Sequence, residues 1–310
     1  MLLTAISIWA LNFSVMKVGI GQISPLAFPI FRFGLGAIVM AVVLRRREGS
    51  LRFQRRDVGL FLVVALLGIS LNQACIVFAL TLTTATNVAL LTATQPIFTA
   101  VIATLVGDEI LGRRHWLSVG LGMLGVVLVV EGGSAADAAS GATAGAPGGL
   151  PLGEILALAV SLTAAASSVA IRRLLRRYSP YRILTIQMII GTAMLLPIAA
   201  PSLAVQDYAA VGPVGWGALA YSAILAGVVT NLLYFTGIRR VGPSRAAIYQ
   251  YVQSFLGVIL AVILLREPLG VLQVVGGVIV IASVAVSRAG TPGSAAGRIR
   301  RRFGLPGLPG

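Results

Sequence analysis

An apolar segment of the chain occurs twice, and the two copies align without a gap. Residues 95–112 read QPIFTAVIATLVGDEILG, and residues 253–270 read QSFLGVILAVILLREPLG. Each copy opens with a glutamine and closes with Glu-x-Leu-Gly. Hydrophobic residues surround the helix axis in both copies, whereas a helix on a soluble surface carries a polar stripe. A duplicated unit of this kind predicts two related halves whose helices lie in lipid.

The composition agrees with a membrane location. Hydrophobic residues make up 57% of the chain, and 24 basic residues stand against 9 acidic ones. A net charge of +15 would also suit a nucleic-acid-binding protein, but the basic residues lie in short connections between apolar runs. Such a distribution is typical of membrane orientation, so we expect a lipid bilayer as partner and no nucleic acid.

Apolar runs of about 20 residues, the length that crosses a bilayer, recur along the whole chain. They lie near residues 2–20, 26–44, 58–79, 86–106, 115–131, 152–172, 182–201, 214–236, 245–265 and 269–287. Short connections with turn formers separate most of them, which favours helices that follow one another as hairpins. The pattern predicts an all-α membrane protein with ten transmembrane helices.

One connection is longer and divides the chain into two units. Residues 132–151 are rich in glycine and alanine, too polar to span a membrane and too small to pack, which predicts a linker. The first five-helix repeat then occupies residues 1–131, and the second occupies residues 152–288. Residues 289–310 form a Gly/Pro/Arg tail that we expect to be disordered and cytoplasmic.

The arginines predict the orientation in the membrane. The connection between the second and third runs carries six of them, and the connections on either side carry none: Arg45, Arg46, Arg47, Arg52, Arg55 and Arg56. The positive-inside rule therefore places this connection in the cytoplasm. With alternating helices, all but Lys17, Arg32 and Arg266 of the 24 basic residues become cytoplasmic. We expect a multi-pass protein of the cytoplasmic (inner) membrane with both termini inside and the linker outside.

The same charges indicate that the halves are inverted. The first connection is neutral and the second basic in the first half, whereas RRLLRRYSPYR follows the first helix of the second half. Because five helices return the chain on the opposite side, the second copy enters the membrane upside down. Inverted repeats of this kind build many secondary transporters.

The chain resembles the drug/metabolite transporter superfamily, in particular its EamA-type branch of ten-helix carriers. The resemblance lies in the order of several motifs: Trp9 with Asn12, Ser24-Pro25 before Phe31-Arg32-Phe33, residues 85–96, residues 109–125, Tyr234, Gly242-Pro243-Ser244, Gln253, Glu267 and Gly276-Gly277. It implies two EamA-like repeats that export or exchange small metabolites, amino acids or drugs. The chain departs from the pattern at Ser254, where the first copy has Pro96. Its first helix also begins almost at residue 1, which leaves open a missing N-terminal head.

Four polar residues near the middle of apolar runs predict a central site. Asn12 and Ser167 are counterparts in the first helices of the two repeats, and Gln95 and Gln253 are counterparts in the fourth helices. Polar groups at membrane depth cost free energy unless they face water or a partner. Two roles stay open: a substrate site at the repeat interface, or hydrogen bonds between helices worth about 0.6 kcal/mol each.

Further polar residues accompany this set. Tyr249 and Gln250 lie one helical turn before Gln253 and share its face, so we include them in the substrate site. Pro96 removes a helical hydrogen bond and predicts a kink beside Gln95. Off-centre polar residues are expected to line the approaches to the cavity: Asn72, Gln73, Asn231 and Tyr234.

Arg32 is the one basic residue expected deep in the membrane. It lies seven residues after Pro25, about 10 Å of helix rise into the lipid. Such an arginine either extends its side chain to the membrane interface or caps carbonyl groups, or it binds an anionic or carboxylate group of the substrate. Both roles stay open, and we place Arg32 among the candidate site residues.

Glu109 and Glu267 end the fourth helix of each repeat. Arginines adjoin both in sequence, Arg113 and Arg114 near the first and Arg266 beside the second. This arrangement favours a structural turn with a local ion pair, and a gate or proton site is the other interpretation.

The sequence favours a secondary transporter that works by alternating access. An enzyme is not expected, because the single histidine, His115, stands among arginines without a metal-binding or nucleophile motif. No cofactor is expected either. A non-transporting membrane sensor or channel subunit is the alternative. The expected partners are a small-molecule substrate, the bilayer and a proton or another coupling solute, with the chain as monomer or homodimer.

Overall fold

The computed structural model describes residues 1–106, 113–140, 152–241 and 249–289, and in these ranges every element is a helix. The first half contains α1 (Leu2–Ile20), α2 (Ala27–Glu48), η1 (Arg55–Asp57), α3 (Val58–Ala65), η2 (Leu66–Ser70), α4 (Leu71–Leu82), α5 (Ala85–Thr92), α6 (Gln95–Leu105) and α7 (Arg113–Ser140). The second half contains α8 (Leu152–Leu174), α9 (Pro180–Val205), α10 (Pro213–Tyr221), η3 (Ser222–Val229), α11 (Thr230–Val241), α13 (Tyr249–Leu265) and α14 (Val271–Ala289).

These elements fall on the ten predicted runs. Seven helical stretches in the described residues are long and apolar enough to cross a membrane. Shorter apolar helices occupy the three remaining places, Gly120–Gly132, Val252–Leu265 and Val271–Ser283. The predicted all-α membrane fold with ten helices is therefore confirmed.

The boundary of the predicted linker differs from the structure. Helix α7 continues to Ser140, into the segment 132–151 that the sequence predicts as linker. Alanines follow the two glycines there, and alanine has the highest helix propensity, which accounts for the extension. Residues 141–151 of the linker and residues 290–310 of the tail lie outside the described part of the chain.

Three of the predicted runs are not continuous α-helices. The fourth span breaks between α5 and α6 at Ala93 and Thr94, directly before Gln95 and Pro96. The predicted kink beside Gln95 is therefore confirmed. The third and eighth spans contain the π-helical segments η2 and η3. A π-turn holds more residues than an α-turn and changes which carbonyl groups are free to bond elsewhere.

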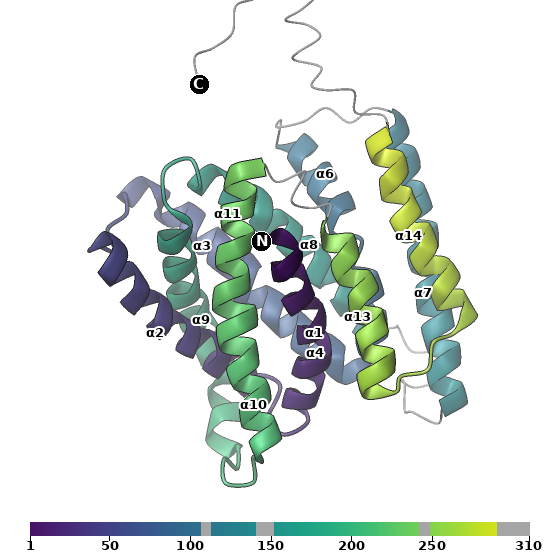
Figure 1. Cartoon of the computed structure of the whole chain (residues 1–310), viewed down its shortest axis with the longest axis horizontal. Helices are drawn as coiled ribbons and strands as arrows, with labels where there is room; N and C mark the ends of the chain where they lie inside the picture. The colour runs from purple at the N-terminus through teal and green to yellow at the C-terminus, as the bar shows by residue number, and fades with distance from the viewer. Residues whose placement is uncertain (107–112, 141–151, 242–248, 290–310) are drawn as a thin grey trace, which may run out of the picture.

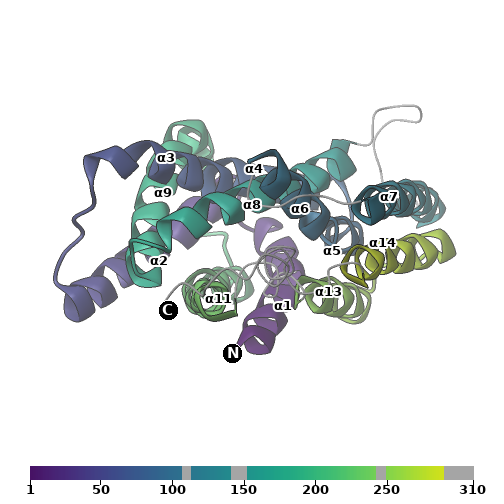
Figure 2. The same ribbon diagram turned by 90° about the horizontal axis from the view of Figure 1, so that it is seen from above.

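Helices of one half pack against helices of the other (Figure 1). Helix α2 lies beside α9 at one side of the molecule, and α7 lies beside α14 at the opposite side, as both views show (Figure 2). Between these pairs, α1 packs on α13 and α4 packs on α8. Each pair joins the two repeats, so the middle of the molecule is an interface between the halves.

The α7–α14 pair shows how closely the helices approach. A Cβ atom added to Gly125 would lie 2.7 Å from the Gly276 carbonyl oxygen, and one added to Gly276 would lie 2.6 Å from the Gly125 carbonyl oxygen. Any larger residue at either position would push the two backbones apart. Small residues allow such crossings in lipid, where dispersion contacts hold helices together.

Candidate functional site

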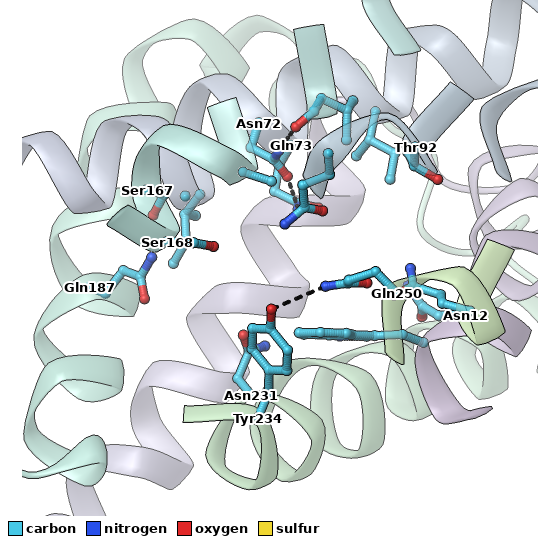
Figure 3. Close-up of a pocket in the computed structure, with 18 of the residues that line it drawn as sticks. Asn12, Asn72, Gln73, Thr92, Ser167, Ser168, Gln187, Asn231, Tyr234 and Gln250 are labelled. Atoms are coloured by element: carbon cyan, nitrogen blue, oxygen red, sulfur yellow. Dashed lines mark hydrogen bonds between the residues drawn. The ribbon is translucent and has the colours of Figure 1, made fainter. Parts of the chain in front are cut away.

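A cavity of about 160 Å³ lies between the two halves and is lined by polar and apolar side chains in similar numbers (Figure 3). Both repeats contribute to it. The predicted site residues that line it are Asn12, Arg32, Asn72, Gln73, Gln95, Ser167, Asn231, Tyr234, Gln250 and Gln253. Asn72, Gln73, Asn231 and Tyr234 were predicted for the approaches, but they line the same cavity as the central set.

Two of the predicted site residues are not assessed at the level of side chains. Tyr249 begins α13, but its side chain lies outside the described part of the structure. Glu109 falls in residues 107–112, which also lie outside it. Their roles stay predictions.

Arg32 is buried in the wall of the cavity, with 4% of its surface exposed. Its Nε donates to the carbonyl oxygen of Ser222 at 3.1 Å, and its Nη1 donates to Gln73 Oε1 at 3.0 Å. Its guanidinium group also lies 4.8 Å from the centre of the Phe33 ring. No carboxylate of the described residues forms an ion pair with Arg32. The side chain is therefore held in place while its charge is not neutralised.

Asn12 joins the same wall from α1. Its Oδ1 accepts a hydrogen bond from Ser222 Oγ at 2.8 Å. Ser222 thus binds Asn12 through its hydroxyl group and Arg32 through its carbonyl group. It is the first residue of the π-helical segment η3, so this segment fixes both side chains.

Gln187, a residue that the sequence analysis missed, lies in the opposite wall with Ser167 (Figure 3). Gln187 Nε2 donates to the Val64 carbonyl oxygen at 3.2 Å, and Ser167 Oγ donates to the same oxygen at 3.4 Å. Gly68 of η2 faces both side chains, and an added Cβ there would overlap Gln187 Nε2 and Ser167 Oγ. Only glycine lets the two side chains reach this carbonyl group.

The remaining walls are held by hydrogen bonds between side chains. Asn72 Nδ2 donates to the Val160 carbonyl oxygen at 3.0 Å and to Thr163 Oγ1 at 2.9 Å. Gln73 Nε2 donates to Asn72 Oδ1 at 3.2 Å. Gln73 therefore connects Asn72 to Arg32, which lies on another helix.

Aromatic residues form a further wall. The rings of Trp9 and Tyr234 lie 5.0 Å apart, and Gln250 Nε2 donates to the Tyr234 hydroxyl at 3.4 Å. Trp9 Nε1 and Asn231 Nδ2 both donate to the Ala226 carbonyl oxygen, at 3.0 and 3.3 Å. This carbonyl belongs to η3, so the π-helical segment supplies acceptors that a regular α-helix would use internally.

Gln95 and Gln253, the duplicated pair, both line the cavity. Gln95 begins α6 just after the break in the fourth span, whereas Gln253 lies inside the continuous helix α13. Oε1 of Gln253 is buried and has no hydrogen-bond partner among the described residues. An unpaired buried acceptor costs free energy, and a ligand with a donor group would satisfy it.

Glu267 lies outside the cavity and has a different partner from the one expected. Its Oε1 lies 3.1 Å from Lys17 Nζ, and no ion pair joins it to Arg266 among the described residues. Its two oxygens accept from the amide groups of Ala85 and Thr86 at 2.9 and 2.8 Å. Glu267 therefore caps the start of α5, where the helix dipole favours an anion.

A wider polar network surrounds this ion pair, which we call the outer tie (Lys17 and Glu267) because the orientation predicted from the arginines puts it on the external side. Lys17 Nζ also donates to the Thr83 carbonyl oxygen at 2.9 Å. Glu154 Oε1 accepts from Thr83 Oγ1 at 2.6 Å and from Asn87 Nδ2 at 3.1 Å. The network connects one end of α1, α5, α8 and α13 and so holds the two halves together at that end.

The cavity has the chemistry of a binding site for a small molecule. In the described residues no group of three or more His, Cys, Asp or Glu side chains could hold a metal ion. The residues lining the cavity offer one cation, several amides and hydroxyls, and aromatic rings. Such a set recognises a small polar molecule through hydrogen bonds and charge.

Comparison with known proteins agrees with the fold. The sequence pattern of the EamA-like transporter family matches residues 1–131 and 151–289. The uncharacterized transporter YyaM of Bacillus subtilis is 26% identical over 88% of this chain and 87% of its own length. An uncharacterized transporter of Archaeoglobus fulgidus is 27% identical over 91% of this chain and 94% of its own. A solved crystal structure superposes with a TM-score of 0.64 at 19% identity, covering 97% of this chain and 96% of the other.

Proposed function

The chain belongs to the EamA-like transporter family, and from this premise we propose that it is a secondary transporter that exports or exchanges small organic anions by alternating access. The substrate is a metabolite, amino acid or drug with an anionic group, and Arg32 binds that group. One observation carries the proposal: the buried guanidinium group of Arg32 lines the cavity without a carboxylate partner.

The geometry of Arg32 suits a ligand. Nε and Nη1 are used by Ser222, Gln73 and Met16, whereas Nη2 has no hydrogen bond to a described residue. A charged group in a low-dielectric site costs free energy when it is not compensated. An anionic substrate would reduce this cost, and it would gain a charge-assisted hydrogen bond.

The repeats support alternating access. The cavity is built from both halves, and each half contributes one helix with a π-helical segment, η2 in the third span and η3 in the eighth. Rocking of two inverted halves around a central site would expose the site to each side in turn. A channel or sensor subunit does not require this paired construction.

Cells that overproduce the protein test the proposal directly. We expect at least one small metabolite with a carboxylate or other anionic group to accumulate in the medium of these cells and not in that of vector-only cells. Mass spectrometry of the medium makes the measurement. The same metabolites at the same levels in both media would contradict export. Accumulation of uncharged or cationic compounds alone would contradict the role of Arg32.

The orientation belongs to the same proposal. Both termini and the connection near Ser50 are cytoplasmic, and the end of α7 near Ser140 is external, because the arginines then follow the positive-inside rule. Two single-cysteine proteins, Ser50→Cys and Ser140→Cys, each with Cys75→Ala, are expected to differ in how an impermeant thiol reagent labels them on intact cells. Position 140 should react at once and position 50 only after permeabilisation. The reverse pattern would overturn the orientation.

A further inference from the structure

Two constant sequence offsets relate the halves of the cavity. Ser24-Pro25 and Ser179-Pro180 are 155 residues apart, and so are Arg32 and Gln187. The duplicated segment has an offset of 158 residues, and so do Val64 and Ser222. Gln187 is therefore the counterpart of Arg32. In the third helices the matches Gly68/Gly227 and Asn72/Asn231 have an offset of 159 residues, so Val64 lies within one residue of the counterpart of Ser222.

The hydrogen bonds of these residues obey the same relation. Arg32 Nε donates to the Ser222 carbonyl oxygen at 3.1 Å, and Gln187 Nε2 donates to the Val64 carbonyl oxygen at 3.2 Å. Each bond runs from the second helix of one repeat to the third helix of the other, at or near a π-helical segment. Both walls of the cavity therefore contain the same interaction, a hydrogen bond from a side chain of the second helix to a carbonyl group of the third helix of the other repeat.

This interaction leaves one polar atom of each donor side chain without a hydrogen-bond partner among the residues that the structure describes. Arg32 Nη2 and Gln187 Oε1 have no hydrogen bond to any residue in the described ranges, and both residues line the cavity. The free atom of Arg32 is a charged donor, whereas that of Gln187 is a neutral acceptor. The two walls therefore complement different groups.

We propose that Gln187 forms a second subsite, which accepts a hydrogen bond from a neutral donor, a hydroxyl or primary amide, at the other end of the anion that Arg32 binds. This inference rests on the proposed function and gives the substrate class more closely. The substrate is a monoanion with an anionic group at one end and an uncharged donor at the other.

The charges around the cavity favour a neutral group at this subsite. No acidic residue of the described part lines the cavity, so an ammonium group there would be buried without a counter-charge. A second carboxylate would meet the unpaired acceptor Gln187 Oε1 and, as a donor, only the second hydrogen of Nε2, whose first hydrogen is donated to the Val64 carbonyl oxygen. The neighbouring Ser167 hydroxyl is also unavailable as a donor, because it donates to the Val64 carbonyl oxygen. A hydroxyl or primary amide group carries no charge and can donate to Gln187 Oε1, so it avoids both costs.

A series of matched acids tests the subsite on the purified full-length protein. The probes are straight-chain carboxylic acids of four to eight carbons whose far end is methyl, hydroxyl, primary amide, ammonium or carboxylate. Isothermal titration calorimetry gives each Kd, and quenching of tryptophan fluorescence provides a second readout, since Trp9 lines the cavity. We expect the hydroxyl- or amide-ended acid of one chain length to bind roughly 2- to 10-fold more tightly than its methyl-ended analogue.

Substitutions of Gln187 assign this preference. In Gln187→Leu the Kd of the methyl-ended acid divided by the Kd of the hydroxyl- or amide-ended acid should fall to about one, while the methyl-ended acid keeps its affinity. In Gln187→Glu, which retains the size of the side chain, the preference should move to the ammonium-ended acid. Gln54→Leu, a glutamine outside the cavity whose Oε1 accepts from Arg56, is the matched control and should keep the wild-type ratio.

Each other result decides against the inference in a recognisable way. Methyl- and amide-ended acids that bind equally at every length would remove the second subsite and leave the Arg32 site intact. A wild-type preference for the ammonium-ended acid, or an unchanged ratio in both Gln187 variants, would also remove it. If no acid of the series binds, the anion site of the proposed function fails first.

Discussion

Replacing Arg32 with glutamine is expected to abolish transport, and replacing it with lysine is expected to weaken transport. Glutamine removes the one cation of the cavity wall, and a hydrogen bond to a charged group contributes about 1.5–3 kcal/mol. Lysine keeps the charge but lacks the planar fork that bonds Ser222, Gln73 and a ligand together. We expect roughly a tenfold higher apparent transport constant for Arg32→Lys. Flux into proteoliposomes of a substrate found in the medium measures both variants.

The control for this experiment separates binding from folding. Arg32 also braces the π-helical segment η3, so Arg32→Gln is expected to lower the melting temperature as well. Arg182→Gln removes an arginine of an ion pair with Glu48, outside the cavity, and should leave flux unchanged. Normal flux in both Arg32 variants would show that Arg32 only braces η3.

Breaking the outer tie is expected to open the cavity toward the outside. Lys17 and Glu267 lie 3.1 Å apart, with 29% and 9% of their side chains exposed, and they join α1 to the segment after α13. Because the pair is partly buried, its loss should shift the balance between closed and open states by roughly tenfold. Lys17→Met and Glu267→Gln should each increase external labelling of a cysteine at Ser168, a residue that lines the cavity.

The double variant Lys17→Met/Glu267→Gln sharpens this test, since it leaves neither charge unpaired. It should increase external labelling of the cysteine at Ser168 at least as much as either single change. Glu48→Gln removes the ion pair between Arg182 and Glu48, which is also 3.1 Å long but lies at the opposite end of the helices. Labelling should remain at the wild-type level in this control. Unchanged labelling in all Lys17 and Glu267 variants would mean that the tie only caps α5.

The sequence predicts the helices and the general position of the cavity because both depend on local chemistry. Apolar runs of bilayer length locate the spans, and Pro96 locates the break of the fourth span beside Gln95. Polar residues at membrane depth need partners or water, so Asn12 and Gln253 in the cavity wall follow from their positions alone.

Other features depend on geometry that the pattern of residues does not encode. The π-helical segments η2 and η3 change the direction of the side chains that follow them, which is why Asn72 and Gln73 line the cavity instead of its approaches. The partner of Glu267 is Lys17, far away in sequence, because the end of α1 lies beside it. Gln187 could have been found from the 155-residue offset that relates it to Arg32.

Accessibility of the cavity from both faces of the membrane tests alternating access most directly. A protein with Cys75→Ala and Ser168→Cys carries one cysteine, in the wall of the cavity. Right-side-out and inside-out vesicles are treated separately with an impermeant thiol reagent. The account predicts labelling from each face, slower from the outside while the outer tie is intact. Labelling from one face alone, or from neither, would contradict it.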